Sequence, residues 1–266
     1  MNRREFAGLA AAAMAIPGAT SASAEGPKEG GRGFAAMHDR RRPEIGMLLY
    51  PGLTLLDLLG PQTALSRSAN VHLLWKSRDL IESDTGIGLR PSSTFADCPK
   101  DLDAIFVPGG PGQIAVMTDV ETIRFVADRG SRAKYVTSVC SGSLVLGAAG
   151  LLRGYKATSH WAARDSLPLF GAIPVDARVV EDRNRITGGG VTAGLDFGLV
   201  LLARLLGEDI AKMTQLAMEY DPHPPFNTGT PQAAGPELTK KVLDQMAPVR
   251  VRMRRASEEA ARLLNG

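Results

Sequence analysis

Cys140 is the residue of this chain whose surroundings best fit a nucleophile. A β-rich run over residues 136–140 ends at this cysteine, and a stretch of small residues with helical character, 141–147, follows directly. This order is typical of a nucleophile elbow, a sharp strand-to-helix turn that raises one side chain from the carboxyl edge of a sheet. The free N–H groups of the helix would lower the pKa of the thiol. We therefore predict a reactive thiolate, although a small buried apolar residue would also suit the position.

Two further side chains are candidates for proton transfer to or from this thiol. Asp57 lies among leucines in residues 53–61, so folding would strip water from its carboxylate and raise its pKa toward usable acid–base values. A helix N-cap role fits Asp57 equally well. His160 is considered because a thiol needs a base or a stabilising cation, but a core or capping role is favoured for it. His223, in a proline-rich segment, is expected to be structural or to lie at a pocket mouth.

Two glycine-rich loops could bring backbone close to a ligand. Gly109 and Gly110 lie in the turn 108–112, and Gly189 lies in the run 188–190, directly before Val191. Their N–H groups, with that of Ser141, could form an oxyanion-type hole beside Cys140. Both loops also suit ordinary tight turns. The dinucleotide-binding pattern Gly-x-Gly-x-x-Gly is absent from the first loop.

Alternating strand and helix signals predict the elements that position these residues. Strands are expected at 45–50, 71–75, 104–107, 134–139, 156–159, 178–181 and 185–187, with a hairpin over 80–91. Helices are expected to begin near Gly60-Pro61 and to cover 120–128, 143–149, 193–206 and 210–218. Such alternation predicts a mainly parallel sheet, with ligands bound at the carboxyl ends of its strands. The loops at 50–57, 108–112, 140 and 188–191 are therefore expected to converge on one pocket.

The two ends of the 266-residue chain differ from its middle. Residues 1–24 resemble a twin-arginine signal peptide, with Arg3-Arg4, an alanine-rich stretch and a small-residue cleavage pattern at 22–24, so export to the periplasm or medium is expected. Residues 25–42 are predicted to be a flexible leader and 43–236 a single catalytic domain. Residues 237–266 are predicted to form a helical tail, broken at Pro248. Its apolar face is expected to pack on the core or, alternatively, on a second subunit; this face comprises Leu238, Val242, Leu243 and Met246.

Composition argues against several other classes of protein. The hydrophobic content of 44%, charged content of 22% and net charge of +3 are ordinary for a globular enzyme, and the arginine clusters at 40–42 and 250–255 are interpreted as solvated surface. No nucleic-acid partner is therefore expected. Neither Cys-x-x-Cys nor His-Glu-x-x-His occurs, so no metal or organic cofactor is predicted. Cys98 is expected to be a structural thiol that forms no disulfide with Cys140.

Residues 45–236 resemble the ThiJ/PfpI superfamily, and within it the isonitrile hydratase group. The matching motifs lie at 50–61, 107–110, 138–142, 157–161, 186–194 and 219–226. The resemblance implies a flavodoxin-like three-layer α/β sandwich of the class I glutamine amidotransferase type, and a homodimer. It also implies that Cys140 is the nucleophile and Asp57 its acid–base partner, because isonitrile hydratases have Asp where other branches often have Glu. Ser141 departs from the Thr of those hydratases.

The expected reaction is hydration of an isonitrile to an N-substituted formamide. The resemblance also leaves open a ThiJ/PfpI-like hydrolase, a glyoxalase-type enzyme, and a small-molecule-binding or stress protein without catalysis. Transcription regulators that share the domain have an appended DNA-binding module of about a hundred residues, for which the thirty-residue tail is too short. The export signal is a second departure, since the resembling hydratases are cytoplasmic.

Overall fold

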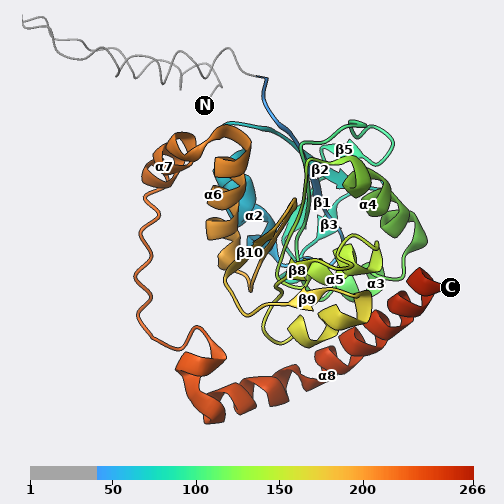
Figure 1. Ribbon diagram of the computed structural model, residues 1–266, viewed down its shortest axis with the longest axis vertical. Coiled ribbons are helices and arrows are strands. Elements are labelled where there is room, and N and C mark those ends of the chain that lie inside the picture. The colour runs from blue at the N-terminus through green and yellow to red at the C-terminus, as the bar shows by residue number, and fades with distance from the viewer. Residues whose placement is uncertain (1–40) are drawn as a thin grey trace, which may run out of the picture. The chain divides into compact units, whose positions relative to one another are not determined.

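A computed structural model describes residues 41–266 of the chain (Figure 1). The predicted signal peptide and almost all of the predicted leader lie outside the described residues. Within the described part, seven strands form one sheet. They are β1 (Glu44–Leu48), β2 (Asn70–Trp75), β5 (Ser93–Thr94), β6 (Ala104–Val107), β7 (Tyr135–Val139), β10 (Val179–Asp182) and β11 (Arg185–Gly188). The predicted hairpin is also present, as β3 (Ile81–Glu82) paired antiparallel with β4 (Gly88–Leu89). A short parallel pair, β8 (Lys156–Ala157) and β9 (Ile173–Pro174), lies outside the main sheet.

The order of the strands is β10-β11-β7-β6-β1-β2-β5. All neighbours pair in parallel except β10 and β11, which are antiparallel. The five central parallel strands thus have the flavodoxin-like order 2-1-3-4-5. All four residues of β6 are buried aliphatic or aromatic side chains, as is usual where helices cover both faces of a parallel sheet. The topology confirms the predicted flavodoxin-like α/β sandwich.

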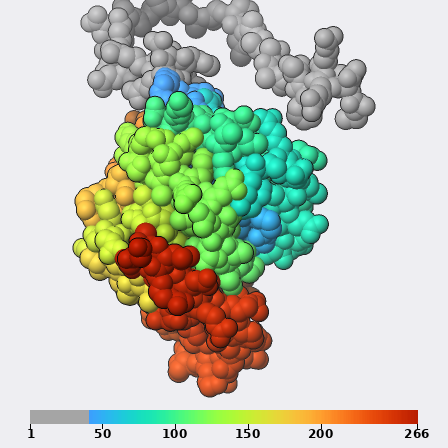
Figure 2. Space-filling view, turned by 90° about the vertical axis from the view of Figure 1, so that its right-hand side faces the viewer, coloured from blue at the N-terminus to red at the C-terminus, as the bar shows by residue number. Residues whose placement is uncertain are grey.

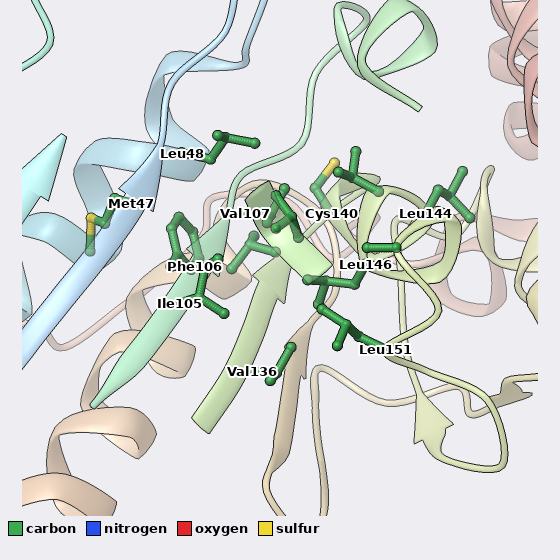
Figure 3. Packing of buried hydrophobic residues seen from close by; sticks show 14 of the residues in the cluster. Met47, Leu48, Ile105, Phe106, Val107, Val136, Cys140, Leu144, Leu146 and Leu151 are labelled. Atoms are coloured by element: carbon green, nitrogen blue, oxygen red, sulfur yellow. The ribbon is translucent and has the colours of Figure 1, made fainter. Parts of the chain in front are cut away.

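Helices cover both faces of the sheet. Figure 1 shows α2 (Leu55–Leu65) and α6 (Ala193–Leu206) together on one side, with α3 (Gln113–Val116), α4 (Val120–Arg132) and α5 (Gly142–Ala148) on the other. The shorter elements η1 (Arg164–Phe170) and α7 (Glu208–Ala217) contact α5 and α6 respectively. Figure 3 shows the core between the sheet and α5, where Val107 and Val136 of the strands approach Leu144 and Leu146 of the helix. No helix within residues 41–266 is both long and apolar enough to cross a membrane.

Helix α2 begins earlier than its sequence predicts. Its N-cap is Thr54 and its first residue is Leu55, so Gly60 and Pro61 lie inside it rather than at its start. A proline in the interior of a helix usually destabilises that helix. Here the close packing of Pro61 against Gly194 and Gly198 of α6 favours a proline at this position. Asp57 is therefore a first-turn residue and not the N-cap, which decides between the two roles that its sequence leaves open.

The C-terminal helix α8 (Pro231–Asn265) also differs from its prediction. A short first turn from Pro231 ends at Gly235, whose non-helical backbone (φ 78°, ψ 168°) interrupts the helix. The long helix that follows starts close to the predicted residue 237, but it continues through Pro248 without the predicted break. Its buried residues lie in the second half, namely Met253, Ala256, Ser257, Ala260 and Ala261. Leu238 of the predicted apolar face is 42% exposed. The second half packs against α3, α5 and η1, so the helix contacts the protein's own core through residues that do not belong to the predicted face.

Candidate active site

Cys140 follows β7 in a strained turn, as a nucleophile elbow requires. Its φ angle is 57°, in the left-handed region that non-glycine residues rarely adopt. Its N–H group donates to the carbonyl oxygens of Gly188 (3.1 Å), the last residue of the neighbouring strand β11, and of Gly189 (2.8 Å), which follows it. Its carbonyl oxygen accepts hydrogen bonds from the hydroxyls of Ser159 (3.0 Å) and Ser143 (3.2 Å). Four hydrogen bonds therefore hold a backbone conformation that would otherwise relax.

Asp57 reaches the same place from the first turn of α2, which follows β1. Its side chain is fully buried, and its Oδ2 accepts a hydrogen bond of 2.9 Å from the N–H of Gly109. Its carboxyl also interacts with the Cys140 thiol. Its Oδ1 has no hydrogen-bond partner among the described residues. One buried carboxyl oxygen therefore remains available to bind a proton.

Hydrogen bonds join the segment between β1 and α2 to the loop after β6, and this brings Asp57 and Cys140 together. The N–H of Thr54, before α2, donates to the carbonyl of Gly109 (2.9 Å), and the N–H of Gly112 donates to that of Gly52 (3.0 Å). The buried Tyr50 hydroxyl donates to the Pro108 carbonyl at 2.7 Å. A Cβ atom at Gly109 would lie 2.7 Å from Asp57 Oδ2, from Cys140 Cβ and from the Ser141 nitrogen. Only glycine therefore allows the loop, the carboxyl and the thiol to approach so closely.

The N–H groups around the sulfur differ from those predicted. The backbone N–H groups of Ser141 and Val191 hydrogen-bond to the Cys140 thiol. The N–H of Gly110 donates instead to the Ser141 hydroxyl oxygen at 3.2 Å, and that of Gly109 is used by Asp57. Gly189 contributes its carbonyl oxygen, not its N–H, to Cys140. The prediction that Gly110 supplies a free oxyanion donor is therefore wrong for this conformation, because the adjacent hydroxyl occupies its N–H.

The prediction of a lowered pKa for Cys140 is also wrong. Burial raises the pKa of the thiol well above its usual value, the negative charge of Asp57 raises it further, and the N–H groups of Ser141 and Val191 only partly oppose these effects. Helix α5 has seven residues, so its dipole is small beside the loss of hydration. Burial raises the pKa of Asp57 to about 7, despite the hydrogen bonds from Gly109 and Cys140. This second prediction, a raised carboxyl pKa, is confirmed. The thiol therefore keeps its proton near neutral pH, while the adjacent carboxyl changes between its protonated and charged forms.

The thiol opens into a cavity of about 450 Å³ whose walls are mostly apolar. Its lining comes from the elbow, from the loop after β6, from the segment around His160 and from α8. The lining residues are Thr54, Gly110, Pro111, Gln113, Cys140, Ser141, His160, Ala162, Ala163, Val191, Met246, Val249, Arg250, Arg252 and Met253. The predicted convergence of the loops on one pocket is confirmed.

The two histidines have no direct role at the thiol in this structure. His160 lines the cavity, but its Nδ1 accepts the N–H of Ala162 (3.2 Å) two residues later, which is the capping role favoured from the sequence. Burial, and to a lesser extent the charge of Arg164, lowers the pKa of His160. His223 is exposed, bonds only locally to the Asp221 carbonyl and does not line this cavity.

Several residues of the site escaped the sequence analysis. Tyr50 donates a hydrogen bond to the loop after β6, and Ser159 donates one to the elbow. Both residues belong to motifs seen in the sequence, but those motifs do not predict these contacts. Gln113 is 1% exposed, lines the cavity, and its Oε1 has no partner among the described residues. Met246 and Met253 lie more than a hundred positions after Cys140, and only the path of α8 brings them near.

Cys98 is a free, buried thiol that donates to the Pro99 carbonyl, away from this site. No group of three or more His, Cys, Asp or Glu side chains suited to a metal ion occurs within residues 41–266.

Comparison with known proteins agrees with this geometry. Residues 44–204 match the model of the DJ-1/PfpI family. The isonitrile hydratase of Pseudomonas putida is 48% identical over 224 residues, which are 84% of this chain and 98% of that protein. The crystal structure of a ThiJ/PfpI family protein from Pseudomonas syringae is 47% identical, with a TM-score of 0.82 over 88% of this chain and 97% of the other. A cysteine-to-alanine mutant of a DJ-1 superfamily protein from Salmonella typhimurium is 30% identical, with a TM-score of 0.63 over 67% of this chain and 99% of the other. Fold, elbow and sequence agree, and the chain belongs to the DJ-1/PfpI family.

Proposed function

We propose that this protein hydrates an isonitrile, R–NC, to the N-substituted formamide R–NH–CHO. The observation that supports the proposal most strongly is the buried Cys140–Asp57 pair, a thiol next to a carboxyl with a pKa of about 7, at the floor of an apolar cavity. An isonitrile is unhindered at its terminal carbon and needs both a nucleophile and a proton there. The 48% identity to the isonitrile hydratase of Pseudomonas putida, over nearly its whole length, supports the same reaction.

In the first step Asp57 and Cys140 exchange a proton. The Asp57 carboxylate accepts the thiol proton, and the Cys140 sulfur forms a bond to the terminal carbon of the isonitrile. Asp57 then returns that proton to the same carbon, which gives the thioimidate R–N=CH–S–Cys140. Because the pKa of Asp57 is about 7, the carboxyl can act in both directions near neutral pH. The N–H groups of Ser141 and Val191 stabilise negative charge on the sulfur before the bond forms.

In the second step water replaces the thiol. Asp57 accepts one proton from a water molecule as the water oxygen bonds to the thioimidate carbon, and it passes this proton to the nitrogen, which gives R–NH–CH(OH)–S–Cys140. Asp57 then accepts the hydroxyl proton as the carbonyl of the formamide forms and the C–S bond breaks, and it returns this proton to the sulfur, which leaves as the thiol. One water is consumed for each isonitrile, and no electrons are gained or lost. The reaction as written uses only residues of this chain.

The direct test is to incubate the purified protein with a simple alkyl isonitrile and to follow formamide by mass spectrometry. Turnover by the wild type and none by a folded Cys140→Ser variant is the expected result. Methylglyoxal should be tested in parallel. Conversion of methylglyoxal without any formamide would favour a glyoxalase-type enzyme and reject the hydratase, and binding without turnover of either compound would favour a non-catalytic binding protein.

We also propose that the protein is exported through the twin-arginine pathway to the periplasm or medium. The support is the order of Arg3-Arg4, the alanine-rich stretch and the small residues at 22–24. The mature chain should begin near Glu25, which N-terminal sequencing of the secreted form would show. Replacing both arginines with lysine should retain the precursor in the cytoplasm; export at the wild-type level would reject the proposal.

We further propose that the protein forms a homodimer. Leu216 is 83% exposed and Phe226 is 76% exposed, and burial of these apolar side chains against a second subunit would favour association. Light scattering should give twice the mass of the chain, and a monomer at micromolar concentration would contradict the proposal.

A further inference from the structure

The outer wall of the Cys140 cavity is built by α8, the last helix of the chain. Met246, Val249, Arg250 and Met253 line the cavity at positions i, i+3, i+4 and i+7, so they occupy one face of this helix. Figure 1 shows α8 passing along the part of the body that contains α3 and α5. We call Met246, Val249 and Met253 the α8 wall. The sequence placed the helix in a tail separate from the catalytic domain.

The α8 wall is held at a fixed position over the site. Arg250 donates from Nε to the carbonyl of Ala162 (3.1 Å) and from Nη2 to the carboxylate of Asp165 (3.3 Å). Arg254 donates to the carbonyl of Asp165 at 3.3 Å. One turn further on, Ser257 is fully buried and its hydroxyl lies 3.7 Å from the sulfur of Met117. Figure 2 shows the surface of α8 lying directly against the body. These contacts fix the register of the helix, and therefore which side chains face the cavity.

The floor and the wall of the cavity differ in chemistry. The floor has the Cys140 thiol, the Ser141 hydroxyl and, beneath them, the Asp57 carboxyl, which suit the reacting N and C atoms of an isonitrile. The three side chains of the α8 wall have no hydrogen-bonding N–H or O–H group, and Arg250 beside them is already bonded to Ala162 and Asp165. A substrate whose reactive carbon lies at the floor would therefore place its R group against an apolar surface.

We infer that the α8 wall selects the substrate by its R group and favours isonitriles with a bulky, neutral, apolar R. This inference rests on the proposed isonitrile hydration and identifies the part of the chain that sets its specificity. Burial of each additional methylene of R against the wall should tighten binding about fourfold. Methionine has three rotatable bonds and a polarisable sulfur, so Met246 and Met253 adapt to R groups of different shape. A cationic R group would lose its hydration there and would be repelled by the guanidinium of Arg252, an exposed residue of α8 that also lines the cavity.

The chain offers a matched pair of variants as a test. Val249 lines the cavity, whereas Val251, two positions along the same helix, is 60% exposed and does not line it. Val249→Phe should fill the space beside the thiol, and Val251→Phe should add the same volume to the solvent side. The measured quantity is kcat/KM for benzyl isonitrile divided by kcat/KM for methyl isonitrile. We expect Val249→Phe to lower this ratio at least about tenfold, in the range that pocket volume usually gives. Val251→Phe should leave it unchanged, and both variants should have the melting temperature of the wild type.

A second variant and a binding measurement complete the test. Met246→Ala should enlarge the cavity and raise the ratio for a still bulkier R group, such as a naphthylmethyl group. Binding of N-benzylformamide, measured by calorimetry, should be weakened by Val249→Phe and not by Val251→Phe. If the wild type hydrates both isonitriles but Val249→Phe leaves the ratio unchanged, the α8 wall has no part in selection and the inference is overturned. If the wild type hydrates neither isonitrile, the proposed function fails. In that case the binding of N-benzylformamide tests the role of the α8 wall separately. Weaker binding to Val249→Phe than to the wild type supports contact between the R group and the wall, and equal or absent binding rejects it.

Discussion

The carboxyl of Asp57 and the thiol of Cys140 interact directly in a buried site, and the pKa of both groups is raised. Burial is the largest cause for each group, and the charge of the carboxylate raises the pKa of the thiol further. The thiol is therefore not activated by its position at a helix terminus alone. In the proposed reaction the thiol becomes nucleophilic by passing its proton to this carboxylate, whose own raised pKa makes it a better proton acceptor than an ordinary aspartate.

Asp57→Asn should abolish most of the activity while preserving the fold. The amide oxygen can still accept the Gly109 N–H, but the side chain cannot move a proton, so we expect kcat to fall at least about a hundredfold. Asp79→Asn, on an exposed loop away from the site, is the control and should retain full activity. Steady-state kinetics and thermal unfolding would be measured for both. Near-normal turnover after Asp57→Asn would reduce Asp57 to a structural residue.

Activity should fall at acidic pH, whereas the contribution of Asp57 to the stability of the folded protein should be largest there. Activity needs the Asp57 carboxylate as proton acceptor, so kcat/KM should fall as the pH drops below about 7. The raised pKa of Asp57 stabilises the folded protein only where its carboxyl is protonated in the folded state, so this contribution is present at acidic pH. It is lost as the pH rises from the value near 4 typical of an unfolded chain to about 7. The melting temperature of Asp57→Asn minus that of the wild type should therefore increase as the pH rises from 4 to 7. A constant difference over that range would contradict the raised pKa.

Alkylation should distinguish the two cysteines. Burial raises the pKa of both thiols. Cys140, however, lines an open cavity and has a proton acceptor beside it, whereas the thiol of Cys98 bonds to a backbone carbonyl. Treatment with iodoacetamide at pH 8, followed by peptide mass mapping, should modify Cys140 first. Peroxide should oxidise the two thiols in the same order. Faster modification of Cys98 would remove Cys140 as the nucleophile.

Gly109→Ala should damage the site through sterics alone. The new methyl group would lie 2.7 Å from Asp57 Oδ2, Cys140 Cβ and the Ser141 nitrogen, so the loop must move away from the elbow. We expect at least about a tenfold loss of kcat, because small displacements of reacting groups have large effects on rate, together with a lower melting temperature. Gly229→Ala, where a Cβ meets nothing within 4 Å, is the control and should alter neither.

The sequence by itself determined those features that depend on neighbouring residues. The order of β-rich run, cysteine and small residues predicted the elbow at Cys140. The apolar run at 104–107 and the helix at 193–206 have the predicted bounds in the structure. Asp57 among leucines predicted a desolvated carboxyl. These predictions succeed because strand burial, helix periodicity and side-chain desolvation leave a pattern within a few residues.

The tertiary structure alone decided the features that depend on distances between remote segments. Val191 and Ser141 hydrogen-bond to the sulfur, while the Gly110 N–H turns to the Ser141 hydroxyl. The direction of the Cys140 pKa shift follows from complete burial beside a carboxylate, which outweighs a short helix. Met246 and Met253 become part of the site because α8 is fastened through Arg250 to the segment after His160. A pattern of a few residues carries no information on which remote backbone groups and side chains will come into contact. At this site those contacts determine the pKa values of the two groups and the shape of the cavity.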